Sequence, residues 1–482
     1  MNSHPLSPKP LTAILGGGIS GLACAFELRQ RGHEVLVIDR RAAPGGRIRT
    51  ERCGGFLVEQ GPNSMIAPAS GAEGLIERLG LGDQRIDKGE GVRHRYLVRG
   101  GRVHALPIDP LGFFTSGFFS LKGRLRLLAE PFIGRGPEDE TVAAFVRRRF
   151  GPELLDYVFD PLVGGLYTGD PERLSIMALL PRLKQLELRY GSVVRGVLAK
   201  KLAGMDPRFD PRRRMPFSFR QGMAVLPQRL AEALGSGLRS GVRVEGVHPR
   251  AGGGYRLALR DKADTASLMA DSVVVALPAY AAARVLAPID PALGQSLASI
   301  EHPPIAVATL GYRRDRVSHP LDGLGVLTPK VEKRNSLGLL FSSTLFAHRA
   351  PEGHVLLTAY LGGARQPGLA LLPREKLIAL ARVEAADLLG ARGEPVHAGV
   401  RYWRQGLPQP GLDHGTRIEG LRNLEGAWPG LFVTGNYLGG VATTACIDSA
   451  LAVAARADAF LKTREVSCGK PRTPTVAVGG FR

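Results

Sequence analysis

The chain has 482 residues, of which 44% are hydrophobic and 22% charged, so it can form two or three domains with ordinary cores. Its 64 lysines and arginines outnumber 44 acidic residues. They are scattered apart from short runs at 147–149 and 212–214, and no nucleic-acid-binding motif accompanies them, which argues against a nucleic-acid partner. The net charge of +20 then has two interpretations, a general bias toward basic residues and attraction to anionic lipid or an acidic substrate.

The cysteines and the N-terminus indicate the cellular compartment. The four cysteines, at positions 24, 53, 446 and 468, have neither metal-binding nor redox spacing, which is typical of reduced intracellular proteins. The first ten residues have no apolar signal core, and no run of 18 apolar residues follows them. We expect a cytoplasmic protein without a bound metal, with disordered ends at 1–10 and 467–482.

Residues 11–39 predict a strand, a tight turn, a helix and a second strand. LTAIL and EVLVID are short apolar runs, and the apolar residues between them recur at helical spacing as far as Gly32. This order is typical of a βαβ unit with parallel strands.

The turn after the first strand has the spacing Gly16-x-Gly18-x-x-Gly21. Gly16 permits the tight turn, Gly18 lets the backbone approach a pyrophosphate, and Gly21 lets the helix pack on the strand. Asp39 ends the second strand, where a carboxylate accepts hydrogen bonds from a ribose. The predicted dinucleotide site comprises Gly16, Gly17, Gly18, Ile19, Ser20, Gly21, Asp39 and Arg40.

The remaining chain alternates between helical and strand-rich parts. Residues 93–107 predict a hairpin, and a helical pattern extends over 108–205. Strands dominate 300–405, and a last strand near 431–435 precedes a long helix that begins at about 442.

We predict a mixed α/β and α+β fold, in which a Rossmann-type dinucleotide-binding domain is interleaved with a strand-rich substrate domain and a helical insert. The expected boundaries are 11–90, 210–275 and 405–465 for the first, 91–107 and 276–404 for the second, and 108–209 for the insert.

Two further glycine-rich segments bear on the choice between NAD and FAD. In Gly45-Gly46-Arg47 the glycines let the chain pass close to a bulky group, and the arginine can bind phosphate through two hydrogen bonds. Gly435 ends a late strand before a helix whose positive end would stabilise a reduced flavin, although a plain turn is the alternative. With both segments the sequence resembles the flavin-binding superfamily of glutathione-reductase and amine-oxidase type, which implies FAD rather than NAD.

Within that superfamily the chain resembles the oxygen-dependent protoporphyrinogen oxidases from about residue 12 to 460. The most specific segment is FVRRRFGPELLDYVFDPLVGGLYTGDPERLSI, and EQGPNS, RYLVRGGRVHALP, FRQGMAVLPQRL, YLGGARQPG and TGNYLGGVATTACI follow the family order. The resemblance implies non-covalent FAD and oxidation of protoporphyrinogen IX to protoporphyrin IX in heme biosynthesis. Three hydride transfers would reduce O₂ to H₂O₂. Coproporphyrinogen III oxidation, a flavin amine oxidase with Trp403 and Tyr437 as its aromatic pair, and a non-catalytic porphyrin-binding relative are the alternatives.

The resemblance also implies site residues. The cofactor contacts beyond the first turn are Gly46, Arg47, Gly61, Pro62, Asn63, Ser64, Val244, Trp403, Gly435, Val441, Ala442 and Thr443, and the substrate contacts are Arg95, Leu162, Gly164, Gly165, Leu324, Leu327 and Tyr360. Asn63 would orient the substrate, and Arg95 would pair with a propionate. Leu324 stands where the family often has an aromatic residue, and Tyr360 where methionine is known. Ala445 replaces a usual Asp, which Asp448 could compensate.

The segment 110–132 has the composition of a membrane-contacting surface. Four phenylalanines precede three basic residues, which suits an anionic lipid surface, and a place in the core or at the substrate mouth is the alternative. These residues are Phe113, Phe114, Phe118, Phe119, Lys122, Arg124 and Arg126. Peripheral attachment to the inner face of the cell membrane, product transfer to a ferrochelatase and a homodimer are further expectations.

Overall fold

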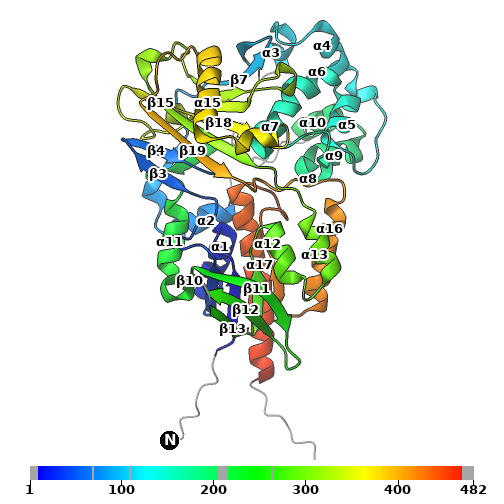
Figure 1. Ribbon diagram of the computed structural model, residues 1–482. Helices are drawn as coiled ribbons and strands as arrows, with labels where there is room; N and C mark the ends of the chain where they lie inside the picture. Colours follow the sequence, from blue (N-terminus) through cyan, green and yellow to red (C-terminus); the bar gives the residue numbers. More distant parts are fainter. Residues whose placement is uncertain (1–8, 68–69, 108–109, 203–214, 262–263, 469–482) are drawn as a thin grey trace, which may run out of the picture.

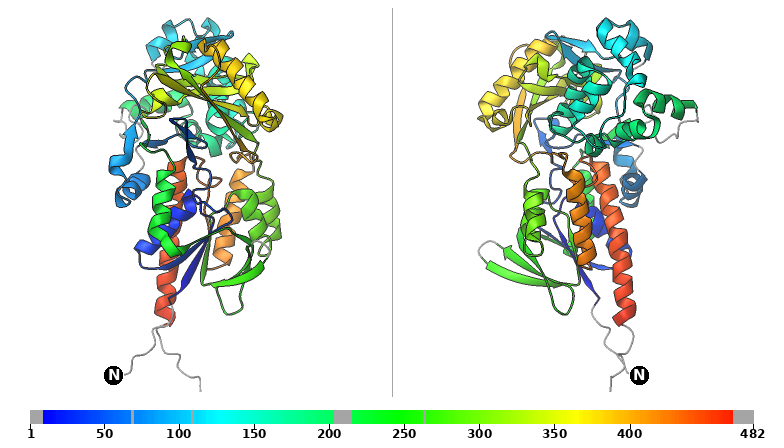
Figure 2. Two further views of the ribbon diagram at one scale, coloured as in Figure 1. Left: turned by 60° about the vertical axis from the view of Figure 1, so that its left-hand side comes forward. Right: turned by 90° about the vertical axis from the view of Figure 1, so that its right-hand side faces the viewer.

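The computed structural model describes residues 9–67, 70–107, 110–202, 215–261 and 264–468. The basic run at 212–214 and most of the ends expected to be disordered lie outside these ranges. The expected disorder is wrong for residues 467–468, because the last helix continues through Cys468. The described part of the chain begins and ends on the same side of the molecule, at the bottom of Figure 1 and of both views in Figure 2.

A five-stranded parallel sheet forms the centre of the lower half of the molecule in Figure 1. Its strand order is β10 (Leu238–Ser240), β2 (Glu34–Asp39), β1 (Leu11–Leu15), β14 (Ser272–Val275) and β20 (Leu431–Val433). Ile14 of β1 pairs with Val37 on one side and with Val274 on the other, so the predicted βαβ unit is confirmed. The strands are apolar on both faces because both faces of the sheet are covered.

Helices cover one face of this sheet, and helices with a small sheet cover the other. The first face packs against α1 (Ile19–Gln30), α2 (Ser70–Arg78), α11 (Val225–Leu234) and α17 (Thr443–Cys468). The second packs against the antiparallel strands β11 (Val242–Pro249), β12 (Tyr255–Asp261) and β13 (Asp264–Ala270), and against α12 (Ala279–Leu286), α13 (Pro291–Ala298) and α16 (His414–Ala427).

The place of α12 and α13 corrects the expected domain boundary at 276. Ala282, Leu286 and Leu297 are fully buried in one cluster with Leu15 and Val275 of the parallel sheet. The strand-rich domain therefore begins only at about Ile305, because the two helices bury their apolar faces against the lower half.

The upper half contains a seven-stranded sheet, to which the predicted hairpin at 93–107 contributes the last two strands. The strand order is β19 (His397–Trp403), β15 (Ile305–Arg313), β18 (His354–Gly362), β17 (Ser336–Phe341), β16 (Gly323–Leu327), β7 (His94–Arg99) and β8 (Arg102–Ala105). Helix α15 (Arg374–Leu389) packs on one face, and α14 (Ser342–Leu345) follows β17. Arg99 pairs with Arg102, which confirms the hairpin.

Short strands and the helical insert complete the molecule. The pair β3 (Thr50–Cys53) and β4 (Phe56–Glu59) lies between the two halves in Figure 1, and β5 (Met65–Ala67), β9 (Met215–Phe219) and β6 (Arg85–Asp87) form a third small sheet. The insert comprises α3 (Pro110–Thr115), α4 (Leu121–Leu128), α5 (Val142–Arg149), α6 (Pro152–Leu154), α7 (Asp160–Tyr167), α8 (Ile176–Leu179), α9 (Pro181–Tyr190) and α10 (Val193–Leu202).

Candidate active site

The glycine turn lies between β1 and α1, at the carboxyl edge of the parallel sheet. Gly16 has φ +110°, and a Cβ on Gly21 would lie 1.9 Å from the Gly16 carbonyl oxygen, so neither position accepts a side chain. A Cβ on Gly18 would meet no heavy atom within 4 Å. The backbone at Gly18 is therefore open toward a ligand at the N-terminus of α1.

Asp39 and the glycine-arginine segment close around this turn. Asp39 accepts hydrogen bonds from the backbone N–H groups of Gly17, at 2.6 Å, and Arg41, at 2.7 Å. The Gly45 N–H donates to the Gly17 carbonyl, and a Cβ on Gly46 would lie 3.1 Å from the Gly18 Cα atom. The predicted Gly46 contact thus sits directly against the predicted phosphate turn.

Arginine positions next to these residues differ in their roles. Arg41 donates through Nη1 to the Gly46 carbonyl at 2.5 Å, a contact that sequence reasoning missed although Arg41 directly follows the predicted Arg40. The Arg40 side chain is exposed. Arg47 is half-buried, and burial lowers the pKa of its guanidinium. Arg47 donates to the Gln405 carbonyl at 2.8 Å, and no acidic side chain pairs with it in the described part of the chain.

The late helix reaches the same place. Ser20, in the first turn of α1, hydrogen-bonds Cys446, in the first turn of α17, whose thiol also feels the charge of Arg47. Two helix N-termini and an arginine without a carboxylate partner therefore converge beside the open backbone of Gly18. Such a donor set fits the pyrophosphate and the anionic ring edge of FAD.

The loop from 435 to 442 lies over the start of α17. Gly435 has φ +153°, and a Cβ there would lie 2.8 Å from the Tyr437 ring. The predicted residues Val441, Ala442 and Thr443 lie at the turn into the helix. Ala445 lies beneath Gly440, and the Asp448 carboxylate is directed at Gly71 of α2 rather than at this loop.

The strand that precedes Val244 lies beside Asp39. Ser240 of β10 pairs with Asp39, and the Gly241 N–H donates to the Arg41 carbonyl at 3.2 Å. The chain then enters β11, where Val244 is half-buried next to a β-bulge that ends at Gly246.

Residues 60–64 form a loop that the two halves hold between them. A Cβ on Gly61 would lie 2.0 Å from the Arg47 carbonyl oxygen, and Trp403 Nε1 donates to the Gln60 carbonyl at 2.6 Å. Asn63 Nδ2 donates to Tyr360 Oη at 2.6 Å. Pro62 and Ser64 are half-buried within the loop. These contacts bring together predicted residues from four separate parts of the chain, namely Arg47, the loop itself, Tyr360 and Trp403.

The Asn63–Tyr360 pair is a polar contact in an apolar surrounding. Tyr360 packs against Ile305, Val307 and Leu337 of the sheet. Burial raises the pKa of Tyr360 to about 12, against the lowering by its Asn63 hydrogen bond, so the phenol stays neutral over the physiological range.

The predicted substrate residues are only partly brought together. A Cβ on Gly165 would lie 2.4 Å from Leu327 Cδ2, so α7 and β16 touch at these residues. A Cβ on Gly164 would lie 2.6 Å from Arg365 Nη2, and Arg365 donates to Asp160 Oδ2 at 2.7 Å. The two glycines make room for side chains of this protein.

Three other predicted residues stand apart from these contacts. Leu324 packs with Val92 and Phe346 in a different cluster from Leu327. Leu162 is half-buried in α7. Arg95 is exposed on β7, where its carbonyl accepts the Leu106 N–H at 2.8 Å. Sequence reasoning missed Arg365, although the segment YLGGARQPG contains it.

Trp403 and Tyr437 do not form an aromatic pair. Trp403 packs with Ile305 and Val307 in the upper half, whereas Tyr437 is buried among residues of the lower half, including Leu421 and Leu424. The arrangement therefore lacks the feature that the amine-oxidase alternative requires of these two residues.

Fold and site together define a FAD-dependent oxidoreductase with a dinucleotide cradle below and an apolar sheet face above. Residues 19–457 match the family described as flavin containing amine oxidoreductase, and the chain belongs to this family. The chain is also 32% identical over 480 residues to the chloroplastic protoporphyrinogen oxidase of Oryza sativa, a match that covers 93% of this chain and 88% of that protein. The resemblance to protoporphyrinogen oxidases is thereby confirmed.

Two further similarities bear on substrate and fold. The chain is 28% identical to the coproporphyrinogen III oxidase of Bacillus subtilis over 94% of this chain and 99% of that protein. It superposes with a TM-score of 0.79 and 22% identity on the crystal structure of a protein from Exiguobacterium named as a candidate protoporphyrinogen oxidase. This match covers 96% of this chain and 100% of the other.

Proposed function

We propose that the chain is an FAD-dependent oxidase that converts protoporphyrinogen IX to protoporphyrin IX with O₂ as acceptor. The observation that carries the proposal is the Asn63–Tyr360 pair between an FAD cradle and an apolar sheet face. The similarity to protoporphyrinogen oxidases over nine-tenths of the chain supports the same substrate. Bound FAD supplies hydride acceptance and reoxidation by O₂.

The residues of the chain bind and orient the substrate in this proposal. A porphyrinogen presents pyrrole N–H donors, and the Asn63 side-chain carbonyl and the Tyr360 hydroxyl oxygen are both acceptors. Because Asn63 Nδ2 is engaged by Tyr360, the amide is held in one orientation. Arg95 is exposed and offers a cation to a propionate at the pocket edge. A hydride transfer that is oriented in this way requires no side-chain acid or base.

The test mixes the purified yellow protein with protoporphyrinogen IX under air and follows porphyrin fluorescence and H₂O₂. We expect porphyrin formation well above autoxidation, with one H₂O₂ per hydride transferred. A rate equal to autoxidation would overturn the proposal. Coproporphyrinogen III is assayed in parallel, since faster turnover of it supports the alternative suggested by the Bacillus relative. Oxidation of a simple amine would support an amine oxidase.

We further propose that the helical insert docks peripherally on the anionic inner face of the cell membrane. The expected lipid contact is wrong for two of the four phenylalanines, because Phe118 and Phe119 are only 6% and 3% exposed and pack in the core of the insert. Arg124 and Arg126 are likewise engaged by backbone carbonyls. None of the helices in the described ranges has the length and apolar character needed to span a bilayer.

Leucines on the outer face of α4 take the place of those anchors. Leu121, Leu125 and Leu128 share one helix face and are 71%, 56% and 58% exposed, and Lys122 lies exposed beside them. Phe132 follows them and is 84% exposed. An apolar face beside a basic residue suits an anionic lipid surface.

Flotation with anionic vesicles tests this surface. The unmodified protein is expected to float at low salt, and the triple variant L121S/L125S/L128S to bind roughly 100-fold more weakly, at about 1 kcal/mol per leucine. Leu371→Ser is the control. Leu371 is 59% exposed, like the three leucines, but it lies outside the insert, directly before α15. Equal flotation of the triple variant would exclude this face. We also propose that the lipophilic product is transferred to a ferrochelatase and that the protein forms a homodimer.

A further inference from the structure

Glu59 is a buried carboxylate that the proposed mechanism does not use. It ends β4, is 3% exposed, and directly precedes the loop 60–64. Thr50 Oγ1 donates to Glu59 Oε2 at 2.7 Å, and the Met223 N–H donates to Oε1 at 2.8 Å. The Ala224 N–H in turn donates to Thr50 Oγ1 at 3.0 Å. One carboxylate therefore joins β3, β4 and the turn before α11.

Arg349 brings a charge from the upper half to the same carboxylate. It lies in the turn after α14, is 2% exposed, and places Nη2 at 3.5 Å from Glu59 Oε1. Nη2 also donates to Ser218 Oγ at 2.8 Å, and the Arg349 carbonyl accepts the Leu57 N–H at 3.0 Å. Nη1 has no partner in the described part of the chain. The ion pair thus crosses between the two halves beside β3 and β4 (Figure 1).

The contacts of Glu59 explain residues in two of the sequence motifs. Gly222 has φ +95°, and a Cβ there would lie 2.3 Å from Thr50 Cγ2, so the turn can approach Thr50 only with glycine at this position. Gly222 and Met223 belong to the segment FRQGMAVLPQRL, and Glu59 to EQGPNS. The contacts between these segments were not readable from either motif alone.

The loop after Glu59 contacts the cofactor region within four residues. Gln60 accepts a hydrogen bond from Trp403, and Asn63 donates one to Tyr360. Gly61 packs closely against the backbone of Arg47, where a side chain would not fit. Glu59 also acts on the far end of the loop through its charge, because that charge raises the pKa of Tyr360 further. A displacement of Glu59 would therefore affect Asn63 and Tyr360 in two ways, through the backbone of the loop and through the charge of the carboxylate.

We propose that Glu59 is a positioning residue of the oxidase: through Thr50 and Met223 it holds the loop 60–64 against the flavin, and Arg349 couples this hold to the upper half. The turnover part of the proposal rests on the proposed function. The part that concerns the flavin environment rests only on FAD binding.

The interactions of Glu59 with Thr50, Met223 and Arg349 depend on pH. Burial raises the pKa of Glu59 to about 7, although Arg349 and the hydrogen bonds from Thr50 and Met223 lower it. In the described part of the chain, the charge of Arg52 also acts on Arg349, and the charge of Glu59 acts on Tyr360. Since the folded pKa lies above the ordinary value, the contribution of Glu59 to stability is complete below that value and is lost as the pH rises through about 7.

Ionisation of Glu59 has the opposite effect on the loop. Above pH 7 the hydrogen bonds from Thr50 and Met223 become charge-assisted and the attraction to Arg349 appears, so the loop is held more tightly. A hollow of about 320 Å³ is lined by Arg349 and His348 among others, so it reaches the Arg349 end of the ion pair. We therefore expect kcat to rise with pH through about 7.

The experiment compares FAD-loaded Glu59→Gln with the unmodified protein between pH 6 and 8.5. Flavin absorbance, flavin reduction potential, and kcat and KM for protoporphyrinogen are measured. The unmodified protein is expected to show a transition near pH 7 in the flavin properties and in kcat. Glu59→Gln is expected to lack it, with kcat roughly tenfold lower at pH 8 and KM changed less than twofold. A transition that persists unchanged in Glu59→Gln would overturn the proposal.

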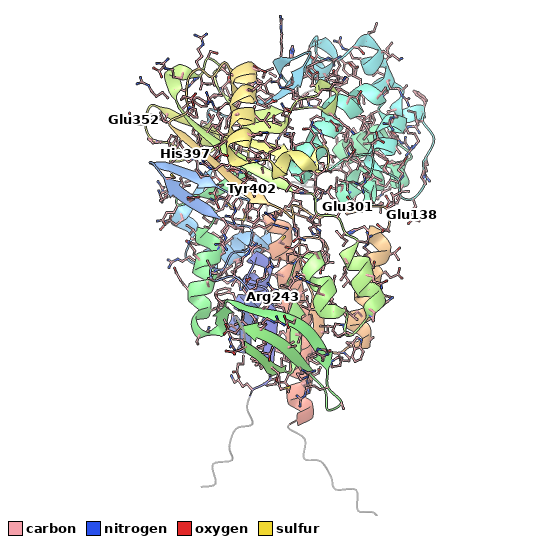
Figure 3. The ribbon with its side chains drawn as sticks, viewed as in Figure 1. Glu138, Arg243, Glu301, Glu352, His397 and Tyr402 are labelled. Atoms are coloured by element: carbon pink, nitrogen blue, oxygen red, sulfur yellow. The ribbon has the colours of Figure 1, made fainter. Side chains whose placement is uncertain are left out.

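Two further variants make the test complete. Glu352→Gln makes the same chemical change three residues from Arg349, at the exposed edge labelled in Figure 3, and should keep the profile of the unmodified protein. Arg349→Met removes the cation and should move the transition to higher pH; a transition at the original pH would contradict the coupling. If the flavin transition depends on Glu59 but no variant oxidises porphyrinogen, the proposed function fails and the positioning role stands.

Discussion

Gly18→Ala is expected to fold like the unmodified chain and to bind FAD roughly 10–100-fold more weakly. Gly18 has φ −79°, which alanine adopts freely, and its Cβ would meet no heavy atom within 4 Å. The methyl group would instead occupy the space through which a pyrophosphate approaches the backbone at the start of α1. Thermal unfolding of the apo-protein and a fluorescence titration with FAD separate the two effects.

Gly21→Ala is the contrasting variant for the same turn. Its Cβ would lie 1.9 Å from the Gly16 carbonyl oxygen, a backbone atom that cannot give way. We expect a lower unfolding temperature even without FAD, as is usual for overpacking against backbone. Unchanged FAD affinity in Gly18→Ala would show that the phosphates do not lie at Gly18.

Arg149→Met is expected to reduce the free energy of unfolding by about 3–5 kcal/mol. The Arg149 side chain is fully buried in the insert, and it donates to Glu130 Oε1 at 3.1 Å and to Glu187 Oε1 at 2.5 Å. Its removal leaves both buried carboxylates without one of the positive charges that balance them. Lys184 and Arg148 are the remaining cations that contact Glu187. Urea unfolding of Arg149→Met and of the unmodified protein measures the loss of free energy directly.

The pH dependence of the same cluster supplies a second measurement. Burial raises the pKa of Glu187, but hydrogen bonds from Arg148, Lys184 and Arg149 outweigh it and hold the pKa at about 2. Because the folded pKa is lowered, the stabilisation is present above the ordinary carboxyl pKa and is lost as the pH falls through about 2. Arg149→Met removes one of the three cationic donors, so acid unfolding is expected to begin at higher pH.

The neighbouring arginine provides the control for this prediction. Arg147 lies on the same helix but is exposed, and its pair with Glu172 is solvent-accessible on both sides. Arg147→Met is therefore expected to change the unfolding free energy by less than about 1 kcal/mol. Equal effects of the two substitutions would contradict the assignment of the stabilisation to the buried cluster.

The βαβ unit and the hairpin at 93–107 were predictable because their signals are local. Period, turn glycines and strand length each act within a few residues, and the registers of β1, β2 and β7 agree with them. The helices α12 and α13 were assigned to the wrong half for the converse reason. An apolar helix face shows that something covers it, but the sequence does not say which sheet does.

The site residues divide in the same way. The phosphate turn and Arg47 follow from glycine spacing in its strand-helix context and from the segment Gly45-Gly46-Arg47. The family resemblance added Gly61, Asn63 and Trp403, which the fold brings together. Phe118 and Phe119 show the limit of what composition can predict. An apolar residue beside basic residues suits a membrane surface and a core equally, and burial alone decides between them.

The sequence by itself predicted a dinucleotide site at Gly16–Gly21, because the tight turn, the close backbone approach and the strand-helix packing are local demands on glycine. Only the tertiary structure decided what surrounds the loop 60–64. Glu59, Met223 and Arg349 meet behind it from distant parts of the chain. Their interaction depends on burial and on distances of a few ångströms, and no local pattern of residues encodes either quantity.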